Sequence, residues 1–290
     1  MAGAAAGAAV VLLQHFYPLD VALIDAELTA QRSEYDGRPR RRSAFDAGEA
    51  IGREVAAAVL AQAATDNFGV AALPPQPTGP GFWVSSGAPT VKGGFGARPF
   101  FLRSGNEINS PPPPAFGSAE YLAALVEVRA FSDARTPEQV ATTLKWVPFS
   151  GVLFNEVAAD LIEQRQLGEV RAARILAYGN LAAFDAIVGC FDTKFTYWFI
   201  RPTQADPAIT LATALPNHPS YPSAHSCETG AWQAVLWDAF PSKIRLVNRT
   251  ANEASLSRVI GGLHYRFDGD AGLKLGRRAG RLALRRGLGE

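Results

Sequence analysis

Apolar residues recur at helical spacing along most of this chain, and this periodicity limits its possible folds more than any other feature. Long segments rich in Ala, Leu and Val place apolar side chains three and four positions apart, as a helix with one buried face requires. Residues 47–64 are an example, with Ile51, Val55, Ala58 and Val59 on the face expected to pack. Alternating apolar and polar tracts, which indicate half-buried strands, are absent. The sequence therefore predicts an all-α protein.

Further helices are expected where a capping residue precedes an apolar periodic segment. They begin at Ser118 and Thr136, cover residues 151–166, and run from Glu169 to about Ile200. Thr136-Pro137 is a strong helix start, because threonine accepts hydrogen bonds from free amide groups and proline tolerates the first helical position. Pro202 opposes continuation of the last of these helices.

Residues 73–116 have a different composition, with Pro74-Pro75-Gln76-Pro77 and the run Pro111 to Pro114. So many prolines cannot sustain a helix, so we expect a long Pro-rich surface loop. A linker between two domains is the alternative, but aromatic residues such as Trp83 and Phe101 favour packing onto the protein. We expect a single all-helical domain over 1–290, in which 1–135 supply N-terminal helices and this wrap, and 136–290 form a helical bundle.

The charges of the chain nearly cancel, with 28 Lys and Arg against 27 Asp and Glu. No general attraction to nucleic acid or to an anionic membrane is expected, so anion binding must be local. The most apolar segment, residues 175–191, carries Asn180 and Asp185, which favours a buried core helix without membrane insertion. Oligomeric state is left open.

The Ala-rich start, Met1 to Leu13, lacks the basic residues of a signal peptide and is expected to open a helix. Location is therefore cytoplasmic by default, and periplasmic or secreted if a leader has been lost. Cys190 and Cys227 could pair in an oxidising compartment, but two thiols in a chain of this size more often lie as small buried hydrophobic residues.

Three short segments concentrate polar residues in this helical background. The first holds Lys194 and Arg201, seven positions apart, which on a helix would project from one face. Two cations at this spacing usually form a solvated face. Here they lie among aromatic residues, including Tyr197 and Trp198, where an exposed face is less natural.

The second segment runs from His218 to Ser226, with prolines that give a sharp turn before a predicted helix. Free amide groups at a helix start favour anions, and Ser223 can add a hydroxyl donor. The alternative is an ordinary serine cap with His225 nearby by chance.

The third segment contains Arg258, the pair Gly261-Gly262, His264 and Asp268. His264 and Asp268 are four positions apart, so the carboxylate can hold one imidazole nitrogen and leave the other free. Arg258 and His264 would lie on different faces of a regular helix, so the two glycines suggest a break that lets them converge. Alone, such a His and Asp pair is more often structural than functional.

Together the segments read K-x6-R-P, then P-S-x-H, then S-R-x5-H-x3-D, and they resemble the signature shared by vanadium haloperoxidases, bacterial acid phosphatases and type 2 phosphatidic acid phosphatases. The resemblance implies a helical bundle of that type and a bound oxyanion. It implies binding through Lys194, Arg201, Ser223, Ala224, Arg258 and His264. Ala224 replaces the family's usual glycine, but its backbone N–H can still donate.

Two chemistries fit this signature. As a vanadium-dependent haloperoxidase, the enzyme would bind vanadate with His264 as its metal ligand and Asp268 orienting that imidazole. His225 would assist proton transfer, and Lys194 would polarise hydrogen peroxide during halide oxidation to hypohalous acid. As an acid phosphatase without cofactor, it would bind phosphate in the same pocket, and His264 would attack phosphorus while His225 protonates the leaving group.

The aromatic residues around Lys194 and the upstream segment containing the four prolines resemble bacterial haloperoxidases more than phosphatases, and haloperoxidase is the favoured interpretation. Hydrogen peroxide, a halide and an organic acceptor are the implied partners. A non-catalytic oxyanion-binding protein is a third interpretation. His218 lies seven positions before His225, where the resemblance places a residue near the halide, which favours bromide or iodide. A cap for the turn at Pro219 is the alternative role for His218.

Overall fold

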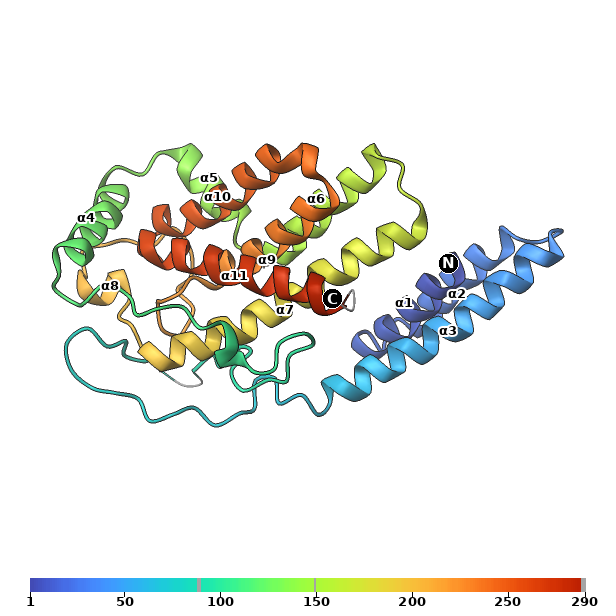
Figure 1. The fold of residues 1–290 in the computed structure, drawn as a ribbon, viewed down its shortest axis with the longest axis horizontal. Helices are drawn as coiled ribbons and strands as arrows, with labels where there is room; N and C mark the ends of the chain where they lie inside the picture. The colour runs from blue at the N-terminus through green and yellow to red at the C-terminus, as the bar shows by residue number, and fades with distance from the viewer. Residues whose placement is uncertain (88–89, 149, 288–290) are drawn as a thin grey trace. The chain divides into compact units, whose positions relative to one another are not determined.

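The computed structural model describes residues 1–87, 90–148 and 150–287 (Figure 1). Its helices are α1 (Ala2–Phe16), α2 (Val21–Ser33), α3 (Pro39–Ala63), α4 (Ala119–Ala134), α5 (Pro137–Lys145), α6 (Ser150–Gln164), α7 (Glu169–Tyr197), α8 (Pro202–Ala205), α9 (Ala224–Ala239), α10 (Ile244–Ile260) and α11 (Arg266–Gly287). Short 3-10 turns cover Gly105–Ile108 and Pro241–Lys243. Within the described ranges there is no strand, only one isolated bridge between Phe82 and Phe199. The all-α prediction is confirmed.

The chain divides into two compact units, one of residues 1–66 with 168–171, the other of residues 67–167 and 172–290. This boundary differs from the subdivision at residue 135 suggested by the sequence, because the Pro-rich segment belongs to the larger unit. Whether the whole chain unfolds as a single domain stays a prediction.

The smaller unit contains α1, α2 and α3. Glycines let the backbones of α1 and α3 approach closely: a Cβ on Gly3 would lie 2.0 Å from the carbonyl oxygen of Phe45, and one on Gly52 2.0 Å from that of Ala4. This contact corrects the predicted packing face of α3. Since α1 packs on the small residues, Ile51 and Val55 point outward and are 59% and 56% exposed.

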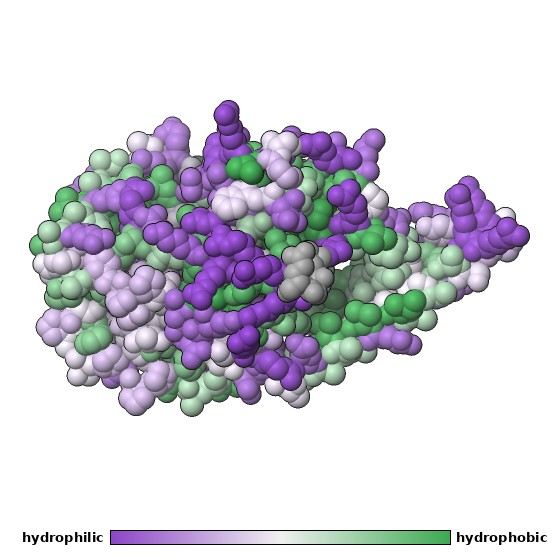
Figure 2. Space-filling view, in the orientation of Figure 1, coloured by the Kyte–Doolittle hydropathy of each residue, from purple (hydrophilic) through white to green (hydrophobic). Residues whose placement is uncertain are grey.

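In the larger unit α9 is the central helix and packs against α6, α10 and α11. Every residue of α9 from Ser226 to Leu236 is buried. Glycines again set the spacing, because a Cβ on Gly272 or Gly276 of α11 would lie 2.6 Å from the carbonyl oxygen of Ser223 or 2.0 Å from that of Cys227. Charged side chains on the outer face of α11 contribute to the hydrophilic belt across the middle of Figure 2.

Among the described residues, α7 is the one helix whose length and composition would allow it to cross a membrane. Much of its apolar surface is used inside the larger unit, where Ala182, Ala186 and Cys190 join the main core. Cys190 and Cys227 are both buried, free thiols in that core.

The Pro-rich segment lies along the larger unit and is held there by aromatic packing and by one carboxylate (Figure 1). Trp83 is buried and stacks on Trp198. Asp185, fully buried on α7, accepts hydrogen bonds from the backbone N–H groups of Phe100, Phe101 and Leu102 at 2.7, 2.7 and 2.9 Å. The predicted surface wrap is therefore present, and Asp185 fastens it to the helix that carries Lys194.

Replacing that carboxylate tests how strongly the wrap is held. Asp185→Ala leaves three backbone donors without their partner, and we expect the free energy of unfolding to fall by about 3 kcal/mol in a urea titration. Asp133→Ala, which removes an exposed carboxylate paired with Arg129 on α4, is the control and should cost less than about 1 kcal/mol. Equal losses in the two variants would contradict the anchoring role.

Candidate active site

The start of α9 forms one side of the candidate site. Ser223 is its N-cap, and the hydroxyl oxygen accepts a hydrogen bond from the N–H of Ser226. The N–H of Ser223 donates to the carbonyl oxygen of Asp268 at 2.9 Å, which fixes this helix start against α11. Ala224 and His225 follow, and the first amide groups of a helix have no carbonyl partner inside it. These donors face a bound anion favourably.

The link between α10 and α11 forms the opposite side. α10 ends at Ile260, directly before the two glycines, as the sequence predicted. Gly262 has a φ of +79°, a left-handed conformation that suits glycine, and the chain turns there toward His264. The convergence of Arg258 and His264 on one cavity thus follows from a helix end.

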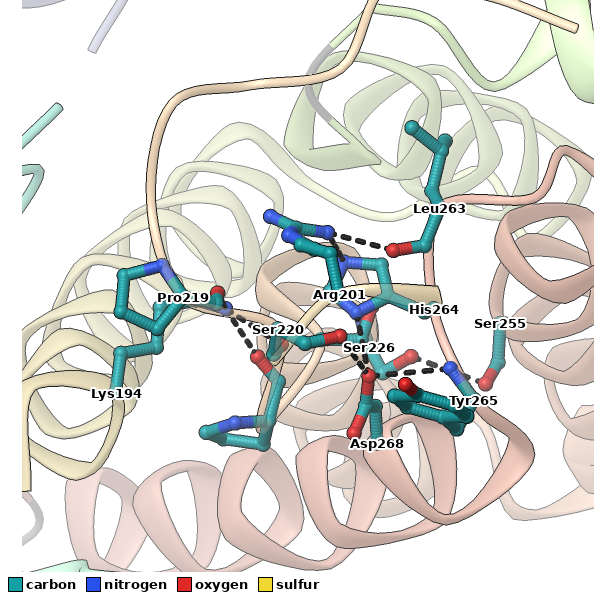
Figure 3. Close-up of polar contacts among 12 residues, drawn as sticks. Lys194, Arg201, Pro219, Ser220, Ser226, Ser255, Leu263, His264, Tyr265 and Asp268 are labelled. Carbon is teal, nitrogen blue, oxygen red and sulfur yellow. Dashed lines mark hydrogen bonds and ion pairs between the residues drawn. The ribbon is translucent and has the colours of Figure 1, made fainter. Parts of the chain in front are cut away.

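His264 is oriented by a buried carboxylate (Figure 3). Its Nδ1 lies 2.9 Å from Oδ2 of Asp268. Since the carboxylate accepts, the imidazole proton is assigned to Nδ1, and Nε2 keeps its lone pair. Burial lowers the pKa of His264 well below its usual value, and the charges of Arg201 and Lys194 lower it further. The ring is therefore neutral, and the lone pair on Nε2 accepts a hydrogen bond from the Arg201 guanidinium at 3.1 Å.

Asp268 has a second side-chain partner that the sequence did not suggest. Ser220, fully buried, donates its hydroxyl to Oδ2 at 2.5 Å, and the N–H of Tyr265 donates to the same oxygen at 3.1 Å. Oδ1 has no hydrogen-bond partner. Burial raises the pKa of Asp268 to about 6. Ser220 is a residue of a Pro-rich turn 48 positions away, so no local pattern could have signalled this contact.

Arg201 joins the two sides of the site. Its guanidinium donates to the carbonyl oxygens of His218 at 3.0 Å and Leu263 at 2.7 Å. It also lies 3.1 Å from Nε2 of His264 and 3.0 Å from Nδ1 of His218. Arg201 is fully buried, and burial lowers its pKa to about 10, so it stays charged at neutral pH.

The route by which Lys194 and Arg201 converge differs from the prediction. α7 ends at Tyr197, earlier than the expected Ile200, because Trp198 adopts a left-handed φ of +50° and turns the chain. Arg201 therefore lies beyond the helix and does not share a helical face with Lys194. The N–H of Trp83 donates to the carbonyl oxygen of Trp198 at 2.6 Å and supports this turn.

Lys194 points under the turn that precedes α9 (Figure 3). Its ammonium group donates to the carbonyl oxygens of Pro219, Ser220 and Pro222 at 2.8, 2.9 and 2.5 Å. An ammonium group has three N–H donors, so all of them are used. Contact between Lys194 and a bound oxyanion stays a prediction, and it requires release of one of these carbonyls.

Arg258 and His225 occupy the remaining side. Arg258 donates to the carbonyl oxygen of Thr143 at 2.6 Å, and Nε2 of His225 lies 2.8 Å from the carbonyl oxygen of Trp146. Burial lowers the pKa of His225 to about 3, with the charge of Arg258 acting in the same direction. Arg258 therefore holds the last turn of α5 and His225 the residue that follows it, while both line the cavity.

These residues surround the inner end of a cavity of about 350 Å³. His218, Ala224, His225, Arg258 and His264 line that end. The outer walls are apolar and include Ile187, Phe191, Leu215 and Pro216. Among the described residues there is no group of three or more His, Cys, Asp or Glu that could hold a metal ion.

The buried charges do not balance. Lys194, Arg201 and Arg258 are at most 3% exposed, whereas Asp268 is the carboxylate that contacts the site. Glu228 on α9 is also buried, but it accepts a hydrogen bond from the start of α6, and burial raises its pKa. Uncompensated buried charge is unfavourable, so a bound oxyanion would complete this arrangement.

Residues 174–287 match a family model described as "PAP2 superfamily". This stretch contains all nine candidate residues from Lys194 to Asp268. The matched residues, 174–287, are called the PAP2 segment below. Outside this PAP2 segment the family model matches nothing further in the chain. A search of curated proteins found no match.

Solved structures extend the likeness beyond the PAP2 segment. A bacterial vanadium-dependent iodoperoxidase is 22% identical, with a TM-score of 0.73, over 91% of this chain and 74% of its own. A bacterial vanadium-dependent chloroperoxidase in its apo form is 14% identical, with a TM-score of 0.75, over 97% of this chain and 82% of its own. At these identities the likeness shows the fold, so the chain has the helical fold of the vanadium haloperoxidases.

The contact between Ser220 and Asp268 can be tested by removing one hydroxyl. Ser220→Ala withdraws a hydrogen bond from a buried carboxylate, and we expect orthovanadate affinity to fall about tenfold because His264 is less firmly oriented. Titration calorimetry measures this affinity. Ser255→Ala, which removes another buried hydroxyl of the PAP2 segment, one hydrogen-bonded to Ser226, should leave the affinity within about twofold. An unchanged affinity in Ser220→Ala would refute the role.

The low pKa of His225 predicts proton uptake on anion binding. At about pH 4 the free imidazole is mostly neutral, and the negative charge of bound sulfate raises its pKa, so binding should take up protons. Sulfate itself has no proton to exchange at this pH. Calorimetry in two buffers of different ionisation enthalpy measures the uptake, which should be smaller in His225→Ala. Equal uptake in both proteins would exclude His225 as the proton acceptor.

Proposed function

We propose that this chain is a vanadium-dependent haloperoxidase that uses hydrogen peroxide to oxidise bromide or iodide. The observation that carries the proposal is the inner end of the cavity, where a neutral, carboxylate-oriented His264 meets buried cations and a helix start. A tetrahedral oxyanion with one open coordination position fits this set, because Nε2 of His264 supplies a single nitrogen ligand and the cations supply charge. Vanadate meets that description.

His264 would bind vanadium, while Arg201, Arg258 and the amide groups at the start of α9 would hold the vanadate oxygens, with the Ser223 hydroxyl as a further donor. Asp268 keeps the proton of His264 on Nδ1, so Nε2 carries the lone pair, and vanadium would replace the hydrogen bond that Arg201 donates to it. When bound, vanadate supplies a Lewis acid that activates hydrogen peroxide without changing oxidation state.

Proton transfer is assigned to His225. Bromide loses two electrons to hydrogen peroxide, the O–O bond breaks, and the products are hypobromous acid and water once one proton has been supplied. His225 lines the cavity, and a bound anion would raise the pKa of its imidazole. Such a pKa suits a group that both gives and takes protons. The apolar walls limit competition by bulk water.

His218 is proposed to lie beside the halide. It is 5% exposed, its ring packs edge-on against Phe191 at 5.1 Å between centroids, and Arg201 bonds its Nδ1. An imidazole in that place, beside a guanidinium and an aromatic ring, favours the larger and more easily oxidised halides.

Acid phosphatase activity is the second candidate, because the same neutral Nε2 of His264 is a suitable nucleophile for phosphorus. His225 would then protonate the departing alcohol, and no cofactor would be needed. The apolar outer walls favour the first candidate, since common phosphomonoesters carry many hydroxyl groups that would find few partners there.

The test measures bromination of a phenolic dye by purified protein with hydrogen peroxide, bromide and orthovanadate, alongside p-nitrophenyl phosphate hydrolysis without vanadate. We expect vanadate-dependent bromination that falls at least a thousandfold in His264→Ala, because the vanadium ligand is lost. His15→Ala, which removes an exposed histidine of α1, is the control and should retain full activity. Phosphate hydrolysis inhibited by vanadate, without bromination, would establish the phosphatase instead.

A further inference from the structure

The cavity above the candidate site has two chemically different parts. Its inner end carries every titratable residue that lines it, namely His218, His225, Arg258 and His264. Arg258 is the sole lysine, arginine, aspartate or glutamate among the described residues of the lining. The outer part therefore offers a ligand no charged partner, although it opens directly onto the place proposed for vanadate.

The outer walls come from four separate parts of the larger unit. Ile187 and Phe191 of α7 form the deep wall and are 8% and 5% exposed. Residues 213–216 form another wall. At the mouth, Val91 and Val147 are 45% and 46% exposed, so apolar side chains continue from the interior to solvent. Such a continuous apolar surface leading to a reactive centre is typical of a binding site for an apolar compound.

The apolar walls determine which organic halogen acceptors can bind in the outer part of the cavity. A charged or polyhydroxylated compound would lose its water and find few hydrogen-bond partners, whereas an aromatic ring would exchange water for contacts with Phe191 and the aliphatic walls. A volume of about 350 Å³ is near the lower limit for ligand pockets, and vanadate would take part of it. One or two fused rings therefore fill the remainder.

We propose that the outer part of the cavity binds a neutral aromatic acceptor of one or two rings, which is halogenated while it is held there. The inference rests on the proposed haloperoxidase function. Hypobromous acid formed at the inner end donates its bromine to a ring carbon, the ring hydrogen leaves as a proton, and that proton and the hydroxide form water. No further oxidant is needed, and the ring carbon nearest the inner end is the one that reacts.

The binding test uses 2-naphthol, a neutral two-ring phenol, titrated into vanadate-free protein and followed by its fluorescence. We expect saturable binding that persists with inorganic phosphate present, because phosphate occupies only the inner end. Val91→Asp places a carboxylate at the mouth and should weaken binding at least tenfold. Val84→Asp is the matched control: Val84 belongs to the same Pro-rich segment, is 61% exposed and is not among the cavity lining, so the affinity of this variant for 2-naphthol should stay within twofold.

Three results would overturn the inference: no saturable binding, competition between 2-naphthol and phosphate, or equal affinities in the two aspartate variants. Binding is measured without vanadate, so it does not depend on halide oxidation. Binding without bromination would therefore refute the proposed function and support the aromatic site.

A second measurement follows turnover. The protein brominates a mixture of 2-naphthol and the cationic phenol (3-hydroxyphenyl)trimethylammonium, and the product ratio is compared with that from free hypobromous acid. A bound acceptor predicts at least a fivefold excess of naphthol product over the free reagent, reduced in Val91→Asp. Identical ratios would mean that hypobromous acid leaves before it reacts, which contradicts the proposal.

Discussion

Buried positive charge held by backbone carbonyl groups is the interaction on which the site depends. Lys194 donates to three carbonyl oxygens, Arg201 to two, and Arg258 to one. Carbonyl groups satisfy hydrogen-bond donors without cancelling their charge. Each cation therefore fixes a piece of backbone, and the site as a whole remains electropositive. The same cations thus stabilise the turn before α9 and supply the positive charge that the proposed oxyanion site requires.

Much of the fold could be predicted from the sequence because it depends on local signals. Thr136 and Ser118 cap α5 and α4 as expected, and the two glycines after Ile260 end α10. The packing of α3 could not be predicted from apolar periodicity, since close approach at Gly52 outweighs the larger side chains on the other face. Hydrophobic periodicity predicts which face of a helix is apolar, whereas the positions of glycines determine which helix backbones can pack closely.

The site was predictable to the extent that its residues lie in short segments of fixed spacing. The predicted residues converge on one cavity or on the turn beside it, and their chemical roles remain proposals. Spacing was misleading for Lys194 and Arg201, because the left-handed Trp198 ends the helix between them. Residue spacing did not indicate a role for Ser220, because its contact with Asp268 forms only after α11 packs on α9. Contacts between distant segments need the folded chain.

The glycine contacts between α9 and α11 also determine where this protein can change shape. Gly272 lies against the carbonyl of Ser223, so the helix start proposed to face the oxyanion and the helix that carries Asp268 are expected to move as one body. The outer cavity is built differently: apart from Ile187 and Phe191 of α7, its walls come from residues 213–216, Val91 and Val147, which lie outside helices. Loop substitutions there could alter the compounds admitted while leaving the inner end untouched. Within this fold, the reaction and the choice of acceptor can therefore evolve separately.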